Sequence, residues 1–410
     1  MKDSPKDSLK GKSQTSSEKA THSKTQGVGR LTIDAVIAIT DIVESIHKRV
    51  SPFSSVKSTN KNETLSGISG LVYRNIRNVT GLVGKSIDAP LAVISQTLAA
   101  DPDSISTQTL LAALNGVLGD HLVLRHNSLA IPMHFRREGK ILNDEQLCHV
   151  INQSNGKLLI MVHGLCMNDI QWYREGHDHG AELTKESGMG AIYLHYNTGR
   201  HISDNGKQFA DLLESLVKLS DKKLEINILA HSMGGLVSRS AFDVAANSGY
   251  QWPKLLKKLV FLGTPHHGAL LEKAGNWIDL ILGAHSYTVP FGRLVTVRSC
   301  GITDLRYGNV QESDWHAIDR FEFSGDQRLP LPLPDNVQCF AVATSSKETN
   351  NSPLGDGLVK IKSALGEHQN PVFDLRIPEI RKWVGTNINH MQLLSDKKVY
   401  QVLKKWFEVQ

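Results

Sequence analysis

From about residue 129 onward, short apolar runs alternate with amphipathic stretches. The runs begin near Lys157, Ala191, Glu225 and Lys257, roughly 33 residues apart. Between the second and third runs, residues 203–219 repeat apolar positions at helical spacing, with Ser203 or Asp204 as the expected N-cap. Continuous apolar strands that alternate with helices predict an α/β fold, in which a mostly parallel sheet is covered by helices on both faces.

Two further regions extend this predicted sheet. Residues 129–136 and 139–142 predict an opening pair of strands, and residues 337–344 predict a later strand. Before that later strand, about residues 269–333 show no clear strand and end in alternating Leu and Pro, which excludes regular helix or central strand. An insertion of this length between two sheet strands predicts a cap over the active site.

The N-terminal part of the chain has a different pattern. Residues 1–30 are rich in Lys, Ser and Thr and predict a disordered basic tail. Residues 31–128 contain amphipathic stretches, the last a short helix over roughly 107–118, and predict a helical segment that packs on a catalytic domain at 129–410. The alternative is that residues 31–120 form a basic amphipathic surface that contacts a membrane or a partner.

Composition limits the classes of function. The chain has 410 residues, of which 40% are hydrophobic and 21% charged, as in ordinary globular proteins. Its net charge of +5 is concentrated in residues 1–30, which hold seven Lys or Arg and three Asp or Glu. The remainder is nearly neutral, so nucleic acid is not an expected partner. No pattern indicates a particular oligomeric state.

The sequence also predicts a location. No apolar run reaches the ~18–20 residues needed to span a bilayer, and the N-terminus has no apolar core of a signal peptide. The four cysteines are Cys148, Cys166, Cys300 and Cys339. Their wide spacing argues against a disulfide framework. A cytoplasmic protein is expected, with peripheral membrane contact as the variant.

The strongest chemical candidate is Ser232, in the segment Ala-His-Ser-Met-Gly-Gly. It follows the apolar run that starts at Glu225 and precedes a helical stretch at 236–246. The small residues Ala230 and Gly234 suit a tight turn in which the backbone approaches closely. Such a turn lifts the hydroxyl to the carboxyl end of the sheet, beside a helix N-terminus. Ser232 is therefore predicted to be a nucleophile.

A serine nucleophile needs a base and an acid that orients the base. His390, just before an amphipathic C-terminal helix, is the preferred base, and His368 is the alternative. Asp356, within Gly-Asp-Gly, is the preferred acid, and Asp374 is the alternative. An oxyanion hole also needs two backbone donors.

Four motifs together resemble the lipase/esterase branch of the α/β-hydrolase superfamily. They are AHSMGG, VHGL, GTPHHG and GDGLV. The resemblance covers roughly residues 129–410 and is similar to triacylglycerol-lipase-like and GPI-inositol-deacylase-like sequences. It implies an α/β-hydrolase fold and acyl-ester hydrolysis without a cofactor. In that reaction Ser232 attacks, His390 transfers the proton, Asp356 orients His390, and the N–H groups of Leu165 and Met233 stabilise the oxyanion.

The predicted function is thus a serine hydrolase that cleaves lipid-like or other apolar carboxylic esters. Within the insertion, Trp277, Leu280 and Ile281 recur at helical spacing and are predicted to contact the acyl chain. The alternatives are an acyltransferase or thioesterase that uses the same residues, and an inactive membrane-associated interaction protein. No metal site is predicted.

Other histidines are interpreted as structural. The cluster at 177–179 and the pair His266 and His267 have no convincing metal-ligand spacing, so they are expected to be solvated histidines in loops.

Overall fold

The computed structural model describes most of the chain from residue 101 onward. The described ranges are 101–220, 224–269, 299–316, 328–348 and 355–408, with 91–92, 95–96 and 98–99. The predictions for the basic tail, for residues 31–90 and for Trp277, Leu280 and Ile281 in the cap all lie outside the described residues.

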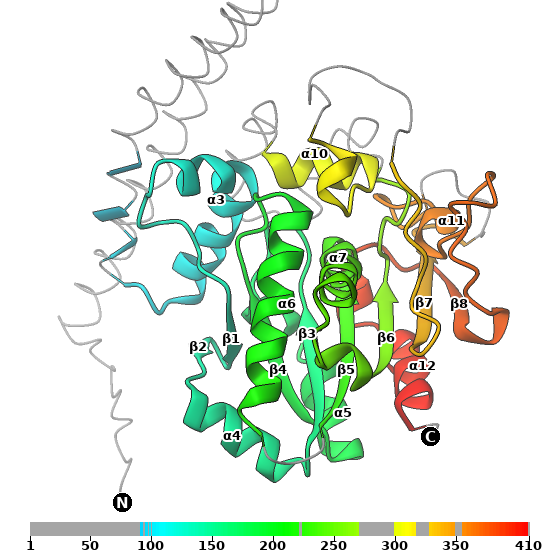
Figure 1. Cartoon of the computed structure of the whole chain (residues 1–410), viewed down its shortest axis with the longest axis horizontal. Coiled ribbons are helices and arrows are strands. Elements are labelled where there is room, and N and C mark those ends of the chain that lie inside the picture. The colour runs from blue at the N-terminus through cyan, green and yellow to red at the C-terminus, as the bar shows by residue number, and fades with distance from the viewer. Residues whose placement is uncertain are drawn as a thin grey trace, which may run out of the picture.

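Within the described ranges, eight strands form one sheet in the order β2-β1-β4-β3-β5-β6-β7-β8 (Figure 1). The strands are β1 His134–Arg137, β2 Lys140–Ile141, β3 Lys157–Val162, β4 Gly190–His195, β5 Glu225–His231, β6 Leu256–Leu262, β7 Gln338–Ser345 and β8 Lys382–Thr386. Strand β1 is antiparallel to β2 and β4, and the sheet from β4 to β8 is parallel. This is the architecture of an α/β-hydrolase, so the predicted fold class is confirmed.

Helices cover both faces of the sheet (Figure 1). They are α3 Ile105–Leu124, α4 Asp144–Gln153, α5 His179–Ser187, α6 Ile202–Lys218, α7 Met233–Ser248, α10 Cys300–Tyr307, α11 Ile361–Ala364 and α12 Lys397–Glu408. Alternate residues of β3 face opposite layers: Leu158 and Ile160 join the core under α6 and α7, whereas Leu159 and Met161 join the core under α5 and α12. No helix of the described residues is long and apolar enough to cross a membrane.

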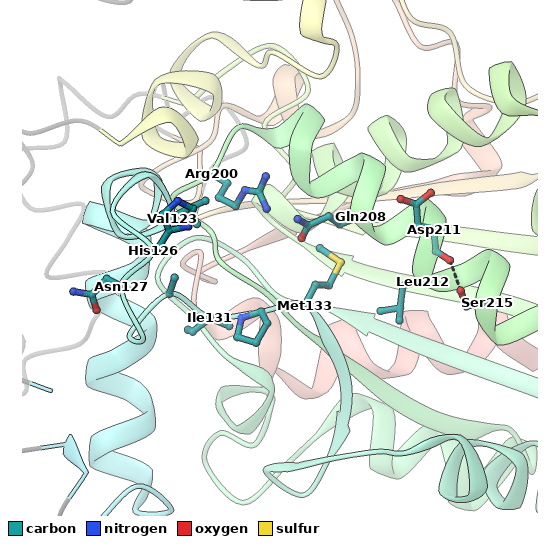
Figure 2. A pocket seen from close by; sticks show the side chains of 12 residues that line it. Val123, His126, Asn127, Ile131, Met133, Arg200, Gln208, Asp211, Leu212 and Ser215 are labelled. Carbon is teal, nitrogen blue, oxygen red and sulfur yellow. Dashed lines mark hydrogen bonds between the residues drawn. The ribbon is translucent and has the colours of Figure 1, made fainter. Parts of the chain in front are cut away.

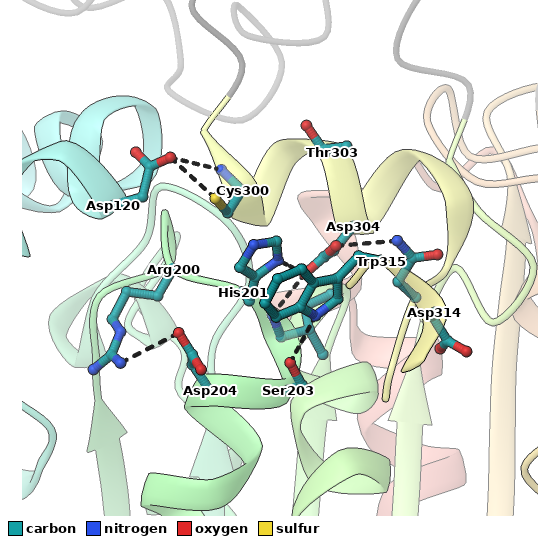
Figure 3. Close-up of polar contacts among 12 residues, drawn as sticks. Asp120, Arg200, His201, Ser203, Asp204, Cys300, Thr303, Asp304, Asp314 and Trp315 are labelled. Carbon is teal, nitrogen blue, oxygen red and sulfur yellow. Dashed lines mark hydrogen bonds and ion pairs between the residues drawn. The ribbon is translucent and has the colours of Figure 1, made fainter. Parts of the chain in front are cut away.

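The start of α6 differs from the prediction. Neither Ser203 nor Asp204 is the N-cap, because the helix begins at Ile202 and the N-cap His201 makes no side-chain cap bond. Asp304 of α10 takes that role from a distance. Its Oδ2 accepts hydrogen bonds from the N–H of Ile202 and from Nδ1 of His201, each at 2.9 Å (Figure 3). A distant carboxylate therefore satisfies the helix end that local sequence leaves open.

The N-terminal helix α3 is part of the same core. It spans 20 residues, longer than the predicted helix over 107–118, and its residues from Ala112 to Gly119 are all buried. Leu114, Val117 and Leu118 belong to the apolar cluster that contains α6 and α7. Helix α3 and the sheet thus share one hydrophobic core.

Candidate active site

Ser232 lies at the turn between β5 and α7. Its backbone has φ 55° and ψ −124°, a conformation that residues with a Cβ rarely adopt. The Ser232 N–H donates to the carbonyl of Leu262 at 2.8 Å, which fixes the turn against β6. A side chain at Gly234 would collide with the carbonyl oxygen of Val162. The turn therefore requires the small residue that the motif supplies.

His390 and Asp356 form a buried hydrogen-bonded pair. Nδ1 of His390 lies 2.7 Å from Oδ2 of Asp356, and each side chain is 1% exposed. The other carboxylate oxygen accepts the backbone N–H groups of Leu358 and Val359, at 2.9 and 2.8 Å. A carboxylate held in this way receives the Nδ1 proton of the imidazole and leaves Nε2 as the basic nitrogen. Among the described residues, that buried Nε2 has no hydrogen-bond partner.

Two neighbours of the serine turn hold this pair beside it. The His231 ring lies 4.7 Å from the His390 ring, and its Nε2 donates to the His390 carbonyl at 3.1 Å. Gly263 follows Leu262 in the chain, and a Cβ on it would lie 3.1 Å from Asp356 Oδ2 and 3.2 Å from His390 Cε1. The structure therefore brings the predicted nucleophile, base and acid to one place at the carboxyl end of the sheet.

The alternative base and acid are bound elsewhere. His368 accepts the N–H of Asn370 at 3.1 Å through Nδ1, and its ring packs against His267. Asp374 accepts the N–H of Arg376 at 2.8 Å. In the described parts of the chain, Asp374 contacts only this turn and His368 contacts the turn and His267, and neither residue contacts the serine.

The two predicted oxyanion donors flank the serine turn. Leu165 lies in the loop after β3, and Met233 is the first residue of α7. Gly164 brings the loop close, since a Cβ on it would lie 3.0 Å from Cβ of Ser232. Within the described ranges, the N–H groups of Leu165 and Met233 have no acceptor. Two backbone donors are thus available beside the hydroxyl, at the positive end of a helix.

Buried neutral histidines surround this site. Burial holds the pKa of His231 well below its usual range. Burial also lowers the pKa of His163 to about 4, and its ring stacks on Tyr196 at 4.4 Å. Sequence reasoning included His231 and Gly263 in the motifs AHSMGG and GTPHHG but gave neither residue a role in holding the base and the acid. The available signal was their position next to Ser232 and next to the end of β6.

The prediction of solvated loop histidines is wrong for His179 and His266, which are both buried. Nε2 of His179 donates to the carbonyl of Leu393 at 2.9 Å, and its Nδ1 meets Nε2 of His177 at 2.7 Å. His179 thus anchors the segment that follows His390. No group of three or more potential metal ligands occurs among the described residues.

A separate cavity of about 760 Å³ opens between the end of α3 and the outer side of α6 (Figure 2). Its lining includes His126, Met133, Arg200 and Asp211. Arg200 is paired with Asp204, 3.3 Å away. The lining contains none of the residues of the serine site.

Comparisons with known proteins do not assign an activity to this chain. Residues 124–296 match a family described as "Domain of unknown function (DUF7379)". No curated protein matches the chain.

Solved structures resemble the chain only distantly. Bacillus licheniformis lipase BlEst2 in mature form is 19% identical, with a TM-score of 0.40, over 61% of this chain and 91% of the lipase. Aspergillus fumigatus lipase B is 10% identical, with a TM-score of 0.38, over 65% of this chain and 53% of the lipase. Carboxyl esterase 2 from Tuber melanosporum is 13% identical, with a TM-score of 0.37, over 62% of this chain and 76% of the esterase. The chemistry of this chain is therefore inferred from its own site.

Proposed function

We propose that this chain is a serine hydrolase that cleaves carboxylic esters. The observation that carries the proposal is the buried His390, whose Nδ1 is bound to Asp356 and whose Nε2 is unpartnered beside the serine turn. Leaving a buried polar atom without a partner costs about 1–3 kcal/mol. If Nε2 of His390 accepts the proton of Ser232, its function explains why the fold keeps this atom without a partner.

In the proposed reaction, Ser232 Oγ attacks the ester carbonyl while its proton passes to Nε2 of His390. The N–H groups of Leu165 and Met233 stabilise the oxyanion. The C–O bond to the alcohol then breaks, and the alcohol takes the proton from His390. Water, deprotonated by the same nitrogen, releases the acid and restores Ser232.

The test compares the wild-type chain with Ser232→Ala. We expect hydrolysis of p-nitrophenyl esters to fall by roughly 10³-fold or more in kcat, because losing one member disables the catalytic unit. A fluorophosphonate should label the wild type and not the variant. Unchanged turnover in folded Ser232→Ala would exclude Ser232 as the nucleophile. A wild type that neither turns over esters nor takes the label would support an interaction protein instead.

Product analysis separates hydrolysis from acyl transfer. Adding an alcohol or supplying a thioester gives the acyl-enzyme another acceptor or another leaving group. We expect free acid to remain the main product from oxygen esters. A dominant new ester would identify an acyltransferase, and a strong preference for thioesters would identify a thioesterase.

We further propose that the ester carries an apolar acyl chain that contacts Trp277, Leu280 and Ile281. Each buried CH₂ contributes ~0.8 kcal/mol, so three or four added methylenes improve binding by at most roughly 2–3 kcal/mol. We expect medium or longer esters to be preferred over acetate. Ile281→Asp should flatten this chain-length profile more than Asp279→Asn. A folded Ile281→Asp variant with an unaltered profile would contradict the assignment.

A further inference from the structure

Helix α3 precedes the segment that carries the four motifs, yet it packs against the loops of the proposed site. It lies beside α10 at one end of the sheet (Figure 1). Ser299 Oγ donates to the carbonyl of Gly116 at 2.7 Å. Figure 3 shows the second bond, in which the N–H of Cys300 donates to Oδ2 of Asp120 at 3.1 Å. These bonds hold α3 in one register against the rest of the domain.

Two glycines let α3 approach the loops after β3 and β4. A Cβ on Gly116 would collide with Sγ of Cys166 and lie 3.0 Å from Cα of that residue. A Cβ on Gly119 would collide with the side chain of Asn197, whose Nδ2 donates to the Gly119 carbonyl at 3.0 Å. Glycine inside a helix costs about 1 kcal/mol relative to alanine. Close contact with these loops is the compensating gain.

Cys166, which α3 contacts through Gly116, directly follows the oxyanion donor Leu165. Cys166 has φ 60°, which is unfavourable for a residue with a side chain. Its N–H donates to Oγ1 of Thr198 at 3.1 Å, and its thiol lies against α3. Cys166 is thus held by α3 on one side and by a hydroxyl on the other.

Contacts on both sides of Leu165 constrain the loop that carries its N–H. On the N-terminal side of Leu165, Gly164 is packed against Ser232. On the C-terminal side, a planar peptide joins Leu165 to Cys166, and the N–H of this peptide donates the hydrogen bond to Thr198. A shift of Cys166 is therefore expected to move the loop that carries the donor.

We propose that Gly116 of α3 and Thr198 are positioning residues that hold Cys166 and so aim the Leu165 N–H at the developing oxyanion. The proposal rests on the proposed ester hydrolysis. It makes the helix α3 a part of the active-site scaffold rather than an accessory layer. The Cys166 thiol fits only if position 116 has no side chain, so substitutions at the two positions should affect each other.

The test is a double-mutant cycle of Gly116→Ala, Cys166→Ala and the two combined. We expect Gly116→Ala to lower kcat by about 10- to 100-fold with KM little changed, because small displacements of catalytic donors cost that much. Removing Sγ relieves the collision, so the double variant should regain at least about tenfold over Gly116→Ala. Circular dichroism and thermal unfolding monitor the fold.

The results distinguish a failure of the positioning role from a failure of the proposed function. A Gly116→Ala protein with wild-type kcat, or no recovery in the double variant, would overturn the positioning role while Ser232-dependent turnover stands. A wild type without Ser232-dependent turnover would refute the proposed function, and the positioning role with it.

If Gly116→Ala does not fold, Thr198→Val and Thr198→Ser test the clamp from the other side. Valine removes the acceptor of the Cys166 N–H and should lower kcat, whereas serine keeps the acceptor and should preserve it. Equal kcat in these two variants would overturn the proposal.

Discussion

Gly263 shows how one backbone position constrains the proposed acid and base together. It has φ 57°, and its missing side chain leaves the space in which Asp356 and His390 meet. Alanine there would need a strained backbone and would also push on the pair. The added Cβ would collide first with Cδ1 of Leu393, at 2.7 Å, and would crowd Oδ2 of Asp356, which forms the hydrogen bond to His390.

We therefore predict that Gly263→Ala lowers kcat by roughly 10- to 100-fold. The matched control is Gly249→Ala, which also has positive φ, at 69°, but has open space around the added Cβ. Both variants should lose stability, and only Gly263→Ala should lose turnover. Equal kcat values in the two folded variants would show that the pair tolerates the added methyl group.

Asp356→Asn tests the orientation of the imidazole. The amide nitrogen of Asn would donate to Nδ1 of His390, which moves the imidazole proton to Nε2 and removes the base. We expect kcat to fall by roughly 10³- to 10⁴-fold, while Asp374→Asn changes little. If Asp374→Asn abolished turnover and Asp356→Asn did not, the choice of acid would be wrong.

At the scale of elements, the junction between α10 and α6 depends on one buried carboxylate. Asp304 accepts bonds from His201, Ile202 and, at 3.1 Å, from Nδ2 of Asn309. Burial raises the pKa of Asp304, and the bond from His201 opposes that shift. The ring of Trp315 stacks on the ring of His201, with the ring centroids 3.6 Å apart.

Replacing Asp304 should therefore weaken the fold in a graded way. Asp304→Ala leaves two buried donors and the half-buried His201 without an acceptor, and it should lower the free energy of unfolding by about 2–4 kcal/mol. Asp304→Asn keeps one oxygen and should cost less. Urea unfolding measures both. Losses below about 0.5 kcal/mol for Asp304→Ala would show that water replaces the carboxylate.

The elements that sequence predicts well are those whose pattern is set by burial alone. Strands β3 to β7 begin within about a residue of their predicted starts, because parallel strands covered on both faces read as apolar runs. The acceptor at the N-terminus of α6 could not be predicted, because Asp304 lies about a hundred residues away in the sequence. The same reason hid Gly263, whose importance depends on the return of residues 356 and 390 to its side.

For the whole molecule, buried neutral histidines predict sensitivity to acid. Burial lowers the pKa of His163 to about 4 and that of His179 to about 3, against 6.5 for an exposed imidazole. The unfolded chain therefore binds protons first as the pH falls. The stability that these residues contribute is complete above pH 6.5 and is lost as the pH falls toward their folded pKa values.

Each such histidine should steepen the loss of unfolding free energy by about 1.4 kcal/mol per pH unit below 6.5. His179→Gln removes one of these titrations, so its stability should fall less steeply than that of the wild type between pH 6 and 4. The exposed His316→Gln serves as the control. Denaturant midpoints across that range give the slopes, and parallel slopes for all three proteins would contradict the prediction.

The position of α3 also bears on how the chain is made. Two of its bonding partners, Ser299 and Cys300, lie 183 and 180 residues later in the sequence. At a synthesis rate of ~5–20 residues per second, the ribosome needs roughly 10–40 s to produce them after α3 has emerged. For that interval the helix, whose residues from Ala112 to Gly119 are all buried in the folded chain, lacks its bonds to Ser299 and Cys300. Contacts of such long range predict slow folding.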